Sequence, residues 1–85
     1  MKLTIAPEAA EQLSRLPKDI QKKANKQFSF LLTSYRHPSL RTRKMGGKGL
    51  FEGRIDLHYR FTFQIDGENI YVLIVGPHDV GLGKK

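Results

Sequence analysis

A histidine and an aspartate follow the most apolar segment of the chain. This segment, IYVLIVG at 70–76, runs into Pro77, and His78 and Asp79 come next. Neutral imidazole accepts a proton near pH 7 and imidazolium donates one, so a histidine at a strand end is a candidate acid or base. Asp79 would orient the ring or simply form the turn. A lone histidine in a turn is more often an ordinary surface residue, and both interpretations stay open.

Two arginines lie on neighbouring apolar segments. Arg54 belongs to FEGRID and Arg60 to HYRFTF. Guanidinium is a planar fork that matches the oxygens of a phosphate. Each arginine alone is equally well explained as an exposed strand residue or as the partner of Glu52 or Asp56. Two arginines on one face of adjacent strands favour a phosphate site.

The charge of the chain points to a polyanionic partner. The 85 residues have a net charge of +7, and residues 36–60 hold seven basic side chains against two acidic ones. A basic surface attracts nucleic acid, although a surface kept basic for solubility remains the alternative. Phe51 lies near these cations and is a candidate for stacking on a base. The residues expected to contact RNA are Arg41, Arg43, Lys44, Lys48 and His58.

Several classes of protein are not expected. The chain has no cysteine, so it has no disulfide scaffold and no thiolate site. Its three histidines are scattered without metal-ligand spacing, and GGKG is too short for a P-loop. No apolar run approaches the ~20 residues that span a bilayer, and the amino terminus does not resemble a signal peptide. A cytoplasmic protein without cofactor or metal is expected.

The amino-terminal half reads as one strand and two helices. KLTIA alternates and ends before Pro7, which suits the first turn of a helix. Pro17 interrupts that helix, and a longer one is expected over 18–35, with apolar residues at helical spacing. The two helices form a hairpin with one shared apolar side.

From residue 41 the apolar period changes to two, which indicates strands. RTRKM is expected to be a short edge strand, and DGEN has the signal of a hairpin turn. IYVLIVG is apolar on both faces, so a central strand with cover on each side is expected. The expected strands are RTRKM (41–45), LFEGRID (50–56), HYRFTFQID (58–66) and IYVLIVG (70–76).

The order of these elements predicts one α+β domain over residues 1–85. The helical hairpin should pack on one face of a mainly antiparallel sheet of about four to five strands, the amino-terminal strand included. Tyr59, Phe61 and Phe63 would face the helices. The other face would be an open, basic, concave surface toward which Arg54 and Arg60 point, with His58 opening the strand on their side.

The segment LFEGRIDLHYRFTFQIDGENIYVLIVGPHD, 50–79, resembles the RelE/ParE superfamily of toxins from type II toxin–antitoxin systems. The preceding strand and helices agree in order and length, so the resemblance extends over nearly the whole chain. It implies the RelE-like fold. It also implies a cognate antitoxin protein as partner, whose acidic segment would bind the basic toxin.

The RelE branch of this superfamily implies a ribosome-dependent mRNA interferase that needs no metal. Its partners would be the ribosome and mRNA. In that reaction the ribose 2′-OH attacks its own 3′ phosphate. The resemblance makes Arg60 and Arg54 the groups that contact the phosphate, and His78 the general acid or base.

Two departures keep other functions open. Position 52 is Glu where RelE proper has lysines around the phosphate, and the tail after residue 79 has no Tyr. The histidine-centred, YafQ-like members are a closer match, and His58 is then a candidate for a further acid or base. The alternatives are a ParE-like DNA gyrase inhibitor that is not an enzyme, and a catalytically weak RNA-binding member of the superfamily.

Overall fold

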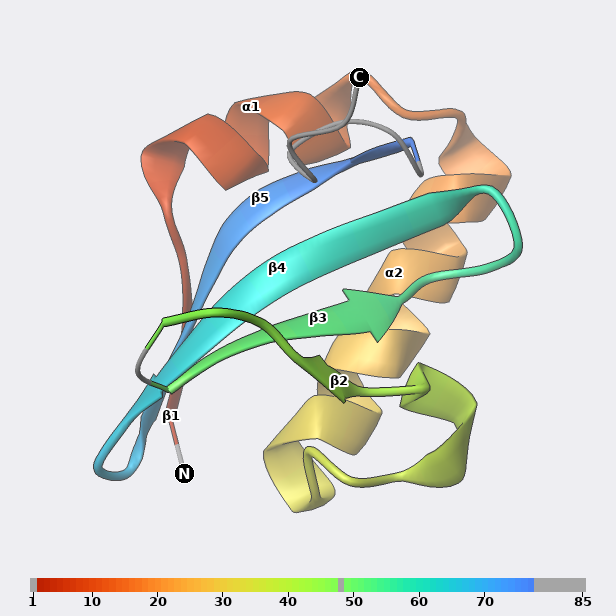
Figure 1. The fold of residues 1–85 in the computed structure, drawn as a ribbon. Coiled ribbons are helices and arrows are strands. Elements are labelled where there is room, and N and C mark those ends of the chain that lie inside the picture. The colour runs from red at the N-terminus through yellow and green to blue at the C-terminus, as the bar shows by residue number, and fades with distance from the viewer. Residues whose placement is uncertain (1, 48, 78–85) are drawn as a thin grey trace.

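The computed structural model describes residues 2–47 and 49–77, which form two helices and one five-stranded sheet (Figure 1). The expected α+β class and the expected order of elements are both confirmed. The elements are β1 (Lys2–Ile5), α1 (Pro7–Ser14), α2 (Lys18–Thr33), the 3-10 turn η1 (Pro38–Leu40), β2 (Arg43–Lys44), β3 (Leu50–Arg54), β4 (Tyr59–Asp66) and β5 (Asn69–Pro77).

The strands lie in the order β1-β5-β4-β3-β2. β1 pairs with β5 in parallel, and the three other pairs are antiparallel, as a mainly antiparallel sheet requires. The two residues of β2 form the expected edge strand. β5 lies inside the sheet between β1 and β4, while β4 takes the middle position. The hairpin between β4 and β5 turns at Gly67, whose φ of 63° lies in the left-handed region that favours glycine.

Prolines set the start of both helices. Pro7 is at the first turn of α1, where its missing N–H costs no hydrogen bond, and Pro17 precedes the first residue of α2. Figure 1 shows α1 beside β5 and α2 behind β4 and β3. Phe28 of α2 contacts Phe61 of β4 edge to face, with ring centroids 5.1 Å apart. The helical hairpin therefore closes one side of the sheet.

One hydrophobic core joins the helices to the sheet. Phe61 and Phe63 of β4 belong to this core, and Tyr59 and Ile65 pack against it, as the alternation of that segment predicts. Its most buried large side chains come from α2, η1, β4 and β5 and are Leu31, Leu40, Phe61, Phe63, Ile70, Val72 and Val75. The face of β4 opposite the core is not covered by the helical hairpin.

β5 continues beyond the end of β1. Ile5 pairs with Val72, so the following residues of β5 have no strand neighbour on that side. There α1 substitutes for a strand, because Gln12 Oε1 accepts a hydrogen bond from the Val75 N–H at 2.8 Å. The β4–β5 register also shifts by one residue, so that Leu73 is the extra residue of a bulge. Leu73 is only half-buried, so the cover expected on both faces of β5 is incomplete.

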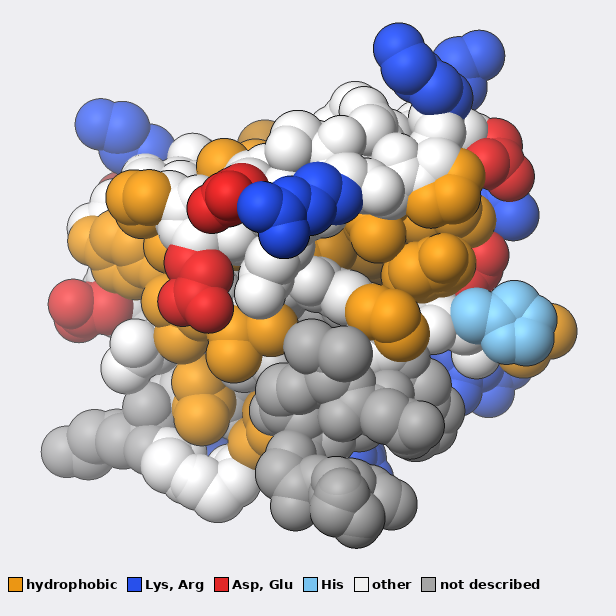
Figure 2. All heavy atoms as spheres, turned by 90° about the horizontal axis from the view of Figure 1, so that it is seen from above, with side chains coloured by type: hydrophobic (Ala, Val, Ile, Leu, Met, Phe, Trp, Pro, Cys, Tyr) orange, Lys and Arg blue, Asp and Glu red, His pale blue; other side chains and the backbone are white. Residues whose placement is uncertain are grey.

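Side chains of both charges lie on the face above α1. Figure 2 shows acidic, basic and hydrophobic side chains mixed on it. No helix in the part of the chain that the structure describes is long and apolar enough to cross a membrane.

Candidate functional site: an arginine-lined hollow

The strand register brings four charged side chains to one face of the sheet. Arg54 of β3 lies directly opposite Arg60 of β4. Two residues away, Glu52 lies opposite Thr62 on one side and opposite Arg43 of β2 on the other. Because alternate residues of a strand share a face, all of these side chains lie on the face opposite the Phe61–Phe63 core. The prediction that Arg54 and Arg60 share a face of adjacent strands is confirmed.

This face is hollowed. A cavity of about 440 Å³ lies over β3 and β4, at the end of the sheet where β2 begins. Its lining contains four arginines and one carboxylate. The lining residues are Arg41, Thr42, Arg43, Glu52, Gly53, Arg54 and Arg60.

Glu52 is buried in this hollow and binds two of the arginines. Its side chain is 5% exposed, and its Oε1 atom lies 3.2 Å from Arg60 Nη1 and 3.2 Å from Arg43 Nη2. The Arg60 side chain is 18% exposed, whereas Arg43 is 65% exposed. Glu52 Oε2 and Arg60 Nε are both buried and have no hydrogen-bond partner within the described residues. The Glu52–Arg60 pair therefore keeps an unused acceptor and an unused donor.

Arg54 differs from Arg60 although the two face each other. It is half-buried, and its guanidinium forms no hydrogen bond or ion pair with any residue that the structure describes. A guanidinium without a partner at the wall of a cavity is available to an anion. Arg54 is thus, like Arg41, a cation of the hollow without an ion pair among the described residues, whereas Arg60 is already held by Glu52.

Gln27 of α2 fixes the wall of the hollow from behind. It is buried, and its Nε2 donates to the backbone oxygens of Arg54, at 2.7 Å, and Ser39, at 3.0 Å. One amide group therefore ties α2 to the end of β3 and to η1. The sequence holds a signal for this role, because Gln27 is a polar residue at helical spacing from Ala24, on the apolar side of the helix.

Arg41 joins η1 to β2 in an unusual backbone conformation. Its φ of 50° and ψ of 46° lie in the left-handed region, and it is the one non-glycine residue there among those described. Non-glycine residues adopt this region rarely, and such residues cluster at ligand sites. The next residue, Thr42, donates from its hydroxyl to the Tyr35 backbone oxygen. The turn therefore holds Arg41 in the lining of the hollow.

The loop between β3 and β4 is built on Asp56. Its Oδ1 accepts hydrogen bonds from the backbone N–H groups of His58, at 2.8 Å, and Tyr59, at 3.0 Å, and Lys23 lies 3.6 Å from Oδ2. Partial burial acts to raise the pKa of Asp56, but these hydrogen bonds and the nearby charges outweigh it, and the pKa is lowered. The carboxylate is thus a structural group of the turn.

The sequence analysis predicts that His58 is the first residue of a strand, and this prediction is wrong. β4 begins at Tyr59, because the Asp56 turn holds residue 58 in the loop. His58 is exposed and does not line the hollow. Its place on the site was predicted from alternation alone, which does not reveal where a turn ends.

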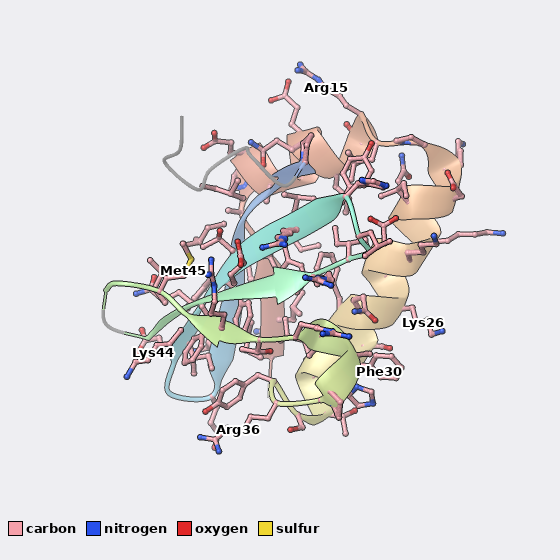
Figure 3. The ribbon with its side chains drawn as sticks, turned by 45° about the vertical axis from the view of Figure 1, so that its right-hand side comes forward. Arg15, Lys26, Phe30, Arg36, Lys44 and Met45 are labelled. Atoms are coloured by element: carbon pink, nitrogen blue, oxygen red, sulfur yellow. The ribbon has the colours of Figure 1, made fainter. Side chains whose placement is uncertain are left out.

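The other predicted residues fall into three groups. Arg41 and Arg43 line the hollow, and their role as RNA contacts stays a prediction. Lys44 lies on the other side of β2, beside a neighbouring hollow, and Figure 3 shows its side chain extending outward from the sheet. Lys48 and His78 lie outside the described residues, so their predicted roles stay predictions. Within 2–47 and 49–77, no group of three or more His, Cys, Asp or Glu side chains could hold a metal ion.

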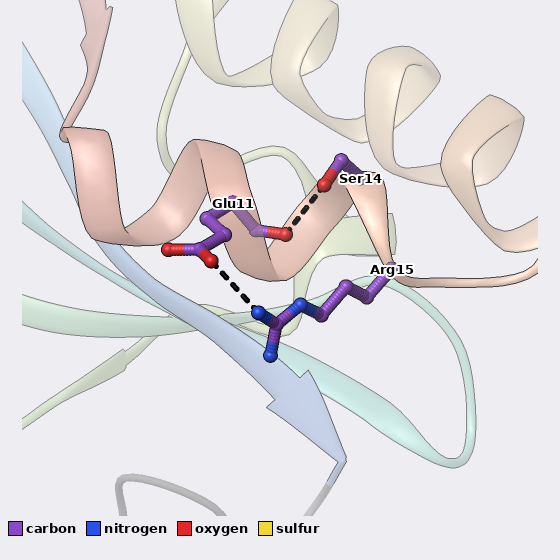
Figure 4. A network of polar contacts seen from close by, with 3 residues as sticks. All are labelled: Glu11, Ser14 and Arg15. Atoms are coloured by element: carbon purple, nitrogen blue, oxygen red, sulfur yellow. Dashed lines mark hydrogen bonds and ion pairs between the residues drawn. The ribbon is translucent and has the colours of Figure 1, made fainter.

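The Glu52 cluster differs from the ion pair on α1. There Arg15 Nη2 lies 2.7 Å from Glu11 Oε2, and Ser14 Oγ donates to the Glu11 backbone oxygen (Figure 4). Both charged side chains of α1 are mostly exposed, and such pairs contribute little to stability. Burial makes the Glu52 contacts stronger and makes their loss more costly.

Sequence comparison finds no relative. No protein-family model matches the chain, and no curated protein matches it.

Structural comparison finds toxins of toxin–antitoxin systems, among them RelE, YoeB and YafQ. The YoeB/ParE toxin from Agrobacterium tumefaciens is 18% identical with a TM-score of 0.79, over 92% of this chain and 99% of that one. The RelE–RelB complex from Pyrococcus horikoshii OT3 is 21% identical with a TM-score of 0.75, over 93% and 96%. The DinJ–YafQ complex from E. coli is 9% identical with a TM-score of 0.77, over 95% and 97%. The protein thus has the RelE-like fold that the sequence predicts.

Proposed function

We propose that the protein is the toxin of a type II toxin–antitoxin system and stops translation by cutting mRNA on the ribosome. The observation that supports this function best is the hollow lined by Arg41, Arg43, Arg54 and Arg60 on the helix-free face of a RelE-like fold. Four guanidinium groups around one cavity suit a phosphodiester, which each can bind through two parallel hydrogen bonds.

The proposed reaction is an internal transfer of the phosphate. The 2′-oxygen of the ribose bonds to the adjacent phosphorus, the bond from phosphorus to the 5′-oxygen of the next nucleotide breaks, and a 2′,3′-cyclic phosphate remains. Arg54 and Arg60 would stabilise the extra negative charge on the phosphate oxygens, and His78 would donate a proton to the leaving 5′-oxygen. A base must take the 2′-hydroxyl proton, and His58, the candidate that the sequence offers, would have to reach it from the loop outside the hollow.

Glu52 adds a condition to this mechanism. Since its carboxylate binds Arg60 and Arg43, a phosphate that reaches Arg60 must compete with Glu52 for the guanidinium. Arg54 has no such competitor among the described residues and would bind the phosphate first. Glu52 accepts a hydrogen bond from Nη1 of Arg60, so a phosphate would use the other N–H groups of this guanidinium.

The proposed partners follow from the same function. The solved RelE, YoeB and YafQ structures that this fold matches include complexes with RelB, YefM and DinJ. We infer that this chain likewise binds a cognate antitoxin, and its net charge of +7 favours an acidic segment. The ribosome as target would place the toxin in the cytoplasm.

The test is protein synthesis in a purified translation system, with the mRNA mapped for new 5′ ends. Wild-type protein should stop synthesis and produce cuts that require ribosomes, and Arg54→Ala and His78→Ala should abolish the cuts. A Lys22→Ala variant, which removes an exposed charge of α2, is the matched control and should cut normally. Intact mRNA and undiminished synthesis with the wild-type protein would refute the proposed function.

A function without catalysis is the second candidate, and Glu52 is the observation that favours it. A carboxylate that neutralises Arg60 weakens a catalytic arginine, whereas a binding surface can still use Arg41 and Arg54. This candidate includes the ParE-like gyrase inhibitor and the RNA-binding member without activity. A supercoiling assay with purified gyrase separates the two, because only the first slows supercoiling while translation continues.

A further inference from the structure

A second hollow, of about 530 Å³, lies beside the first at the end of the molecule that holds η1. It belongs to no step of the proposed cleavage. Six residues of its lining combine three aromatic rings with three cations: Tyr35, His37, Phe51, Arg36, Arg41 and Lys44. Its volume is within the range of small-ligand pockets, about 300 to 1,000 Å³.

The three cations of this hollow are unneutralised. No acidic residue contributes to the lining, and Arg36, Arg41 and Lys44 form no ion pair with any described residue. Figure 3 shows Arg36 after the end of α2 and Lys44 at β2, both extending away from the ribbon. The Arg36 guanidinium lies 5.4 Å from the centroid of the Tyr35 ring. The hollow therefore favours an anion.

The aromatic rings are held in place from behind. Phe63 of the core stacks on Phe51 with centroids 5.5 Å apart, and Tyr35 is tilted against Phe51 at 5.2 Å. Phe30 covers one face of His37 at 4.0 Å with the rings nearly parallel. Rings that are already fixed lose little conformational entropy when a flat ligand stacks on them. The hollow therefore suits a planar ring that bears a negative charge nearby.

Arg41 and Thr42 connect the two hollows, since both residues line both of them. An RNA chain bound in the arginine-lined hollow would have to pass Arg41 to reach the second one. The hydrogen bond from Thr42 to the Tyr35 backbone fixes the wall that the two hollows share.

We propose that the second hollow binds one nucleotide of single-stranded RNA, next to the nucleotide whose phosphate lies among the arginines of the first. Its base stacks on the aromatic rings, and Arg36 and Lys44 bind its phosphate. This inference rests on the proposed function, because it takes the RNA bound here to be the mRNA that the protein cuts. An acidic peptide would match the three cations but would leave the aromatic lining unexplained. The hollow thus determines which nucleotide lies beside the cut.

The first experiment measures the binding of an octanucleotide RNA, uncleavable because its riboses are 2′-O-methylated, by fluorescence anisotropy. Wild-type protein should bind it at least about fivefold more tightly than an abasic chain of equal length and charge. Phe51→Leu, which keeps an apolar side chain, should reduce that ratio toward one, and Arg36→Ala should weaken both ligands. Lys26→Ala, on α2 and distant from Arg36 in Figure 3, should change neither affinity. Equal affinity of the wild type for both chains would overturn the proposal.

Nuclear magnetic resonance of the wild-type protein tests the same site without a substitution. Adenosine or uridine 5′-monophosphate should shift the amide signals of residues 35–37 and 51. Shifts confined to Arg54 and Arg60, or a Glu-rich octapeptide that binds the second hollow more tightly than the RNA does, would refute a nucleotide site.

The translation assay separates a failure of this inference from a failure of the proposed function. Cuts without nucleotide preference in Phe51→Leu and wild type alike would sink this inference alone, and nucleotide binding without cuts would sink the proposed cleavage alone.

Discussion

Arg54 and Arg60 lie directly opposite each other on β3 and β4, yet only Arg60 is bound by a carboxylate. Two guanidinium groups on adjacent strands repel each other unless an anion lies between or beside them. Glu52 neutralises one of the two and leaves the other for an external anion. The pair therefore consists of one arginine held by a carboxylate of the fold and one without a partner among the described residues.

Replacement of Arg54 by Ala should weaken RNA binding without loss of stability. Its guanidinium has no partner among the described residues, so the free energy of unfolding should change by less than ~0.5 kcal/mol. The affinity should fall, and the slope of log affinity against log salt concentration should decrease by about 1. Anisotropy titrations at several salt concentrations, with urea unfolding beside them, check both. A large loss of stability would mean that Arg54 has a structural partner.

Glu52→Gln should have the opposite effect. It keeps the shape of the side chain but removes the charge that binds Arg60 and Arg43, so RNA should bind more tightly and with a steeper salt dependence. The free energy of unfolding should fall by about 1–3 kcal/mol, because a largely buried guanidinium loses its counter-charge.

The matched control for Glu52→Gln is Glu8→Gln, an equal charge change at an exposed position of α1. It should leave both RNA affinity and stability nearly unchanged. If Glu52→Gln bound RNA no better than Glu8→Gln does, Glu52 would not compete with RNA for the arginines.

The sequence was sufficient to predict the elements and the face on which the arginines lie. Alternation in HYRFTFQID placed Phe61 in the core and Arg60 on the opposite face, and Pro7 and Pro17 marked the helix starts. These features depend on local rules of periodicity and backbone geometry. They can therefore be predicted without knowing which distant residues each segment contacts.

Contacts between distant segments were not predictable in the same way. The sequence suggested Glu52 as one possible partner of either arginine, but only the β2–β3–β4 register places it beside Arg60 and Arg43 together. Arg41 adopts a left-handed backbone that its residue type does not favour. Tyr35 packs against the core and also lines the second hollow. Such features follow from tertiary packing.

Gly53 should tolerate no side chain. A Cβ atom at this position would lie 2.5 Å from Cζ of Phe61, a residue packed in the core. Gly53→Ala should therefore lower the free energy of unfolding by about 2 kcal/mol or more, through overpacking. Urea unfolding checks this against Gly46→Ala, where a Cβ meets nothing within 4 Å. Equal stability of the two variants would contradict the close packing of β3 on the Phe61 ring.

Gln27→Leu should disturb the arginine-lined hollow, because Gln27 holds the backbone of its wall. The substitution keeps a side chain of similar size but leaves the backbone oxygens of Arg54 and Ser39 without their donor. A buried group that loses its hydrogen bond costs about 1–3 kcal/mol, so stability should fall by at least that amount and RNA affinity should fall with it. Asn25→Leu on the exposed side of α2 is the control. If only stability fell, Gln27 would hold the fold without positioning Arg54.

The Asp56 turn should make part of the stability depend on pH. The pKa of Asp56 is lower in the folded protein than in the unfolded chain, so its charge stabilises the fold above the unfolded value, about pH 4. That contribution is lost as the pH falls through the lower, folded pKa. Asp56→Asn keeps an acceptor for the His58 and Tyr59 N–H groups but has no charge. It should be less stable than the wild type by about 0.5–1 kcal/mol at pH 7, and less so at high salt.

This difference between the wild type and Asp56→Asn should shrink as the pH falls through the lowered pKa of Asp56, and it should vanish once the wild-type carboxyl is protonated as well. Urea unfolding from pH 7 to pH 2.5 measures it, with Asp66→Asn as the control at an exposed position. A difference that stayed constant over the whole range would mean that the loop depends on the shape of the side chain and not on its charge. The pH at which the difference disappears then reports whether the N–H groups that begin β4 bind a carboxylate, as the short contacts to His58 and Tyr59 imply.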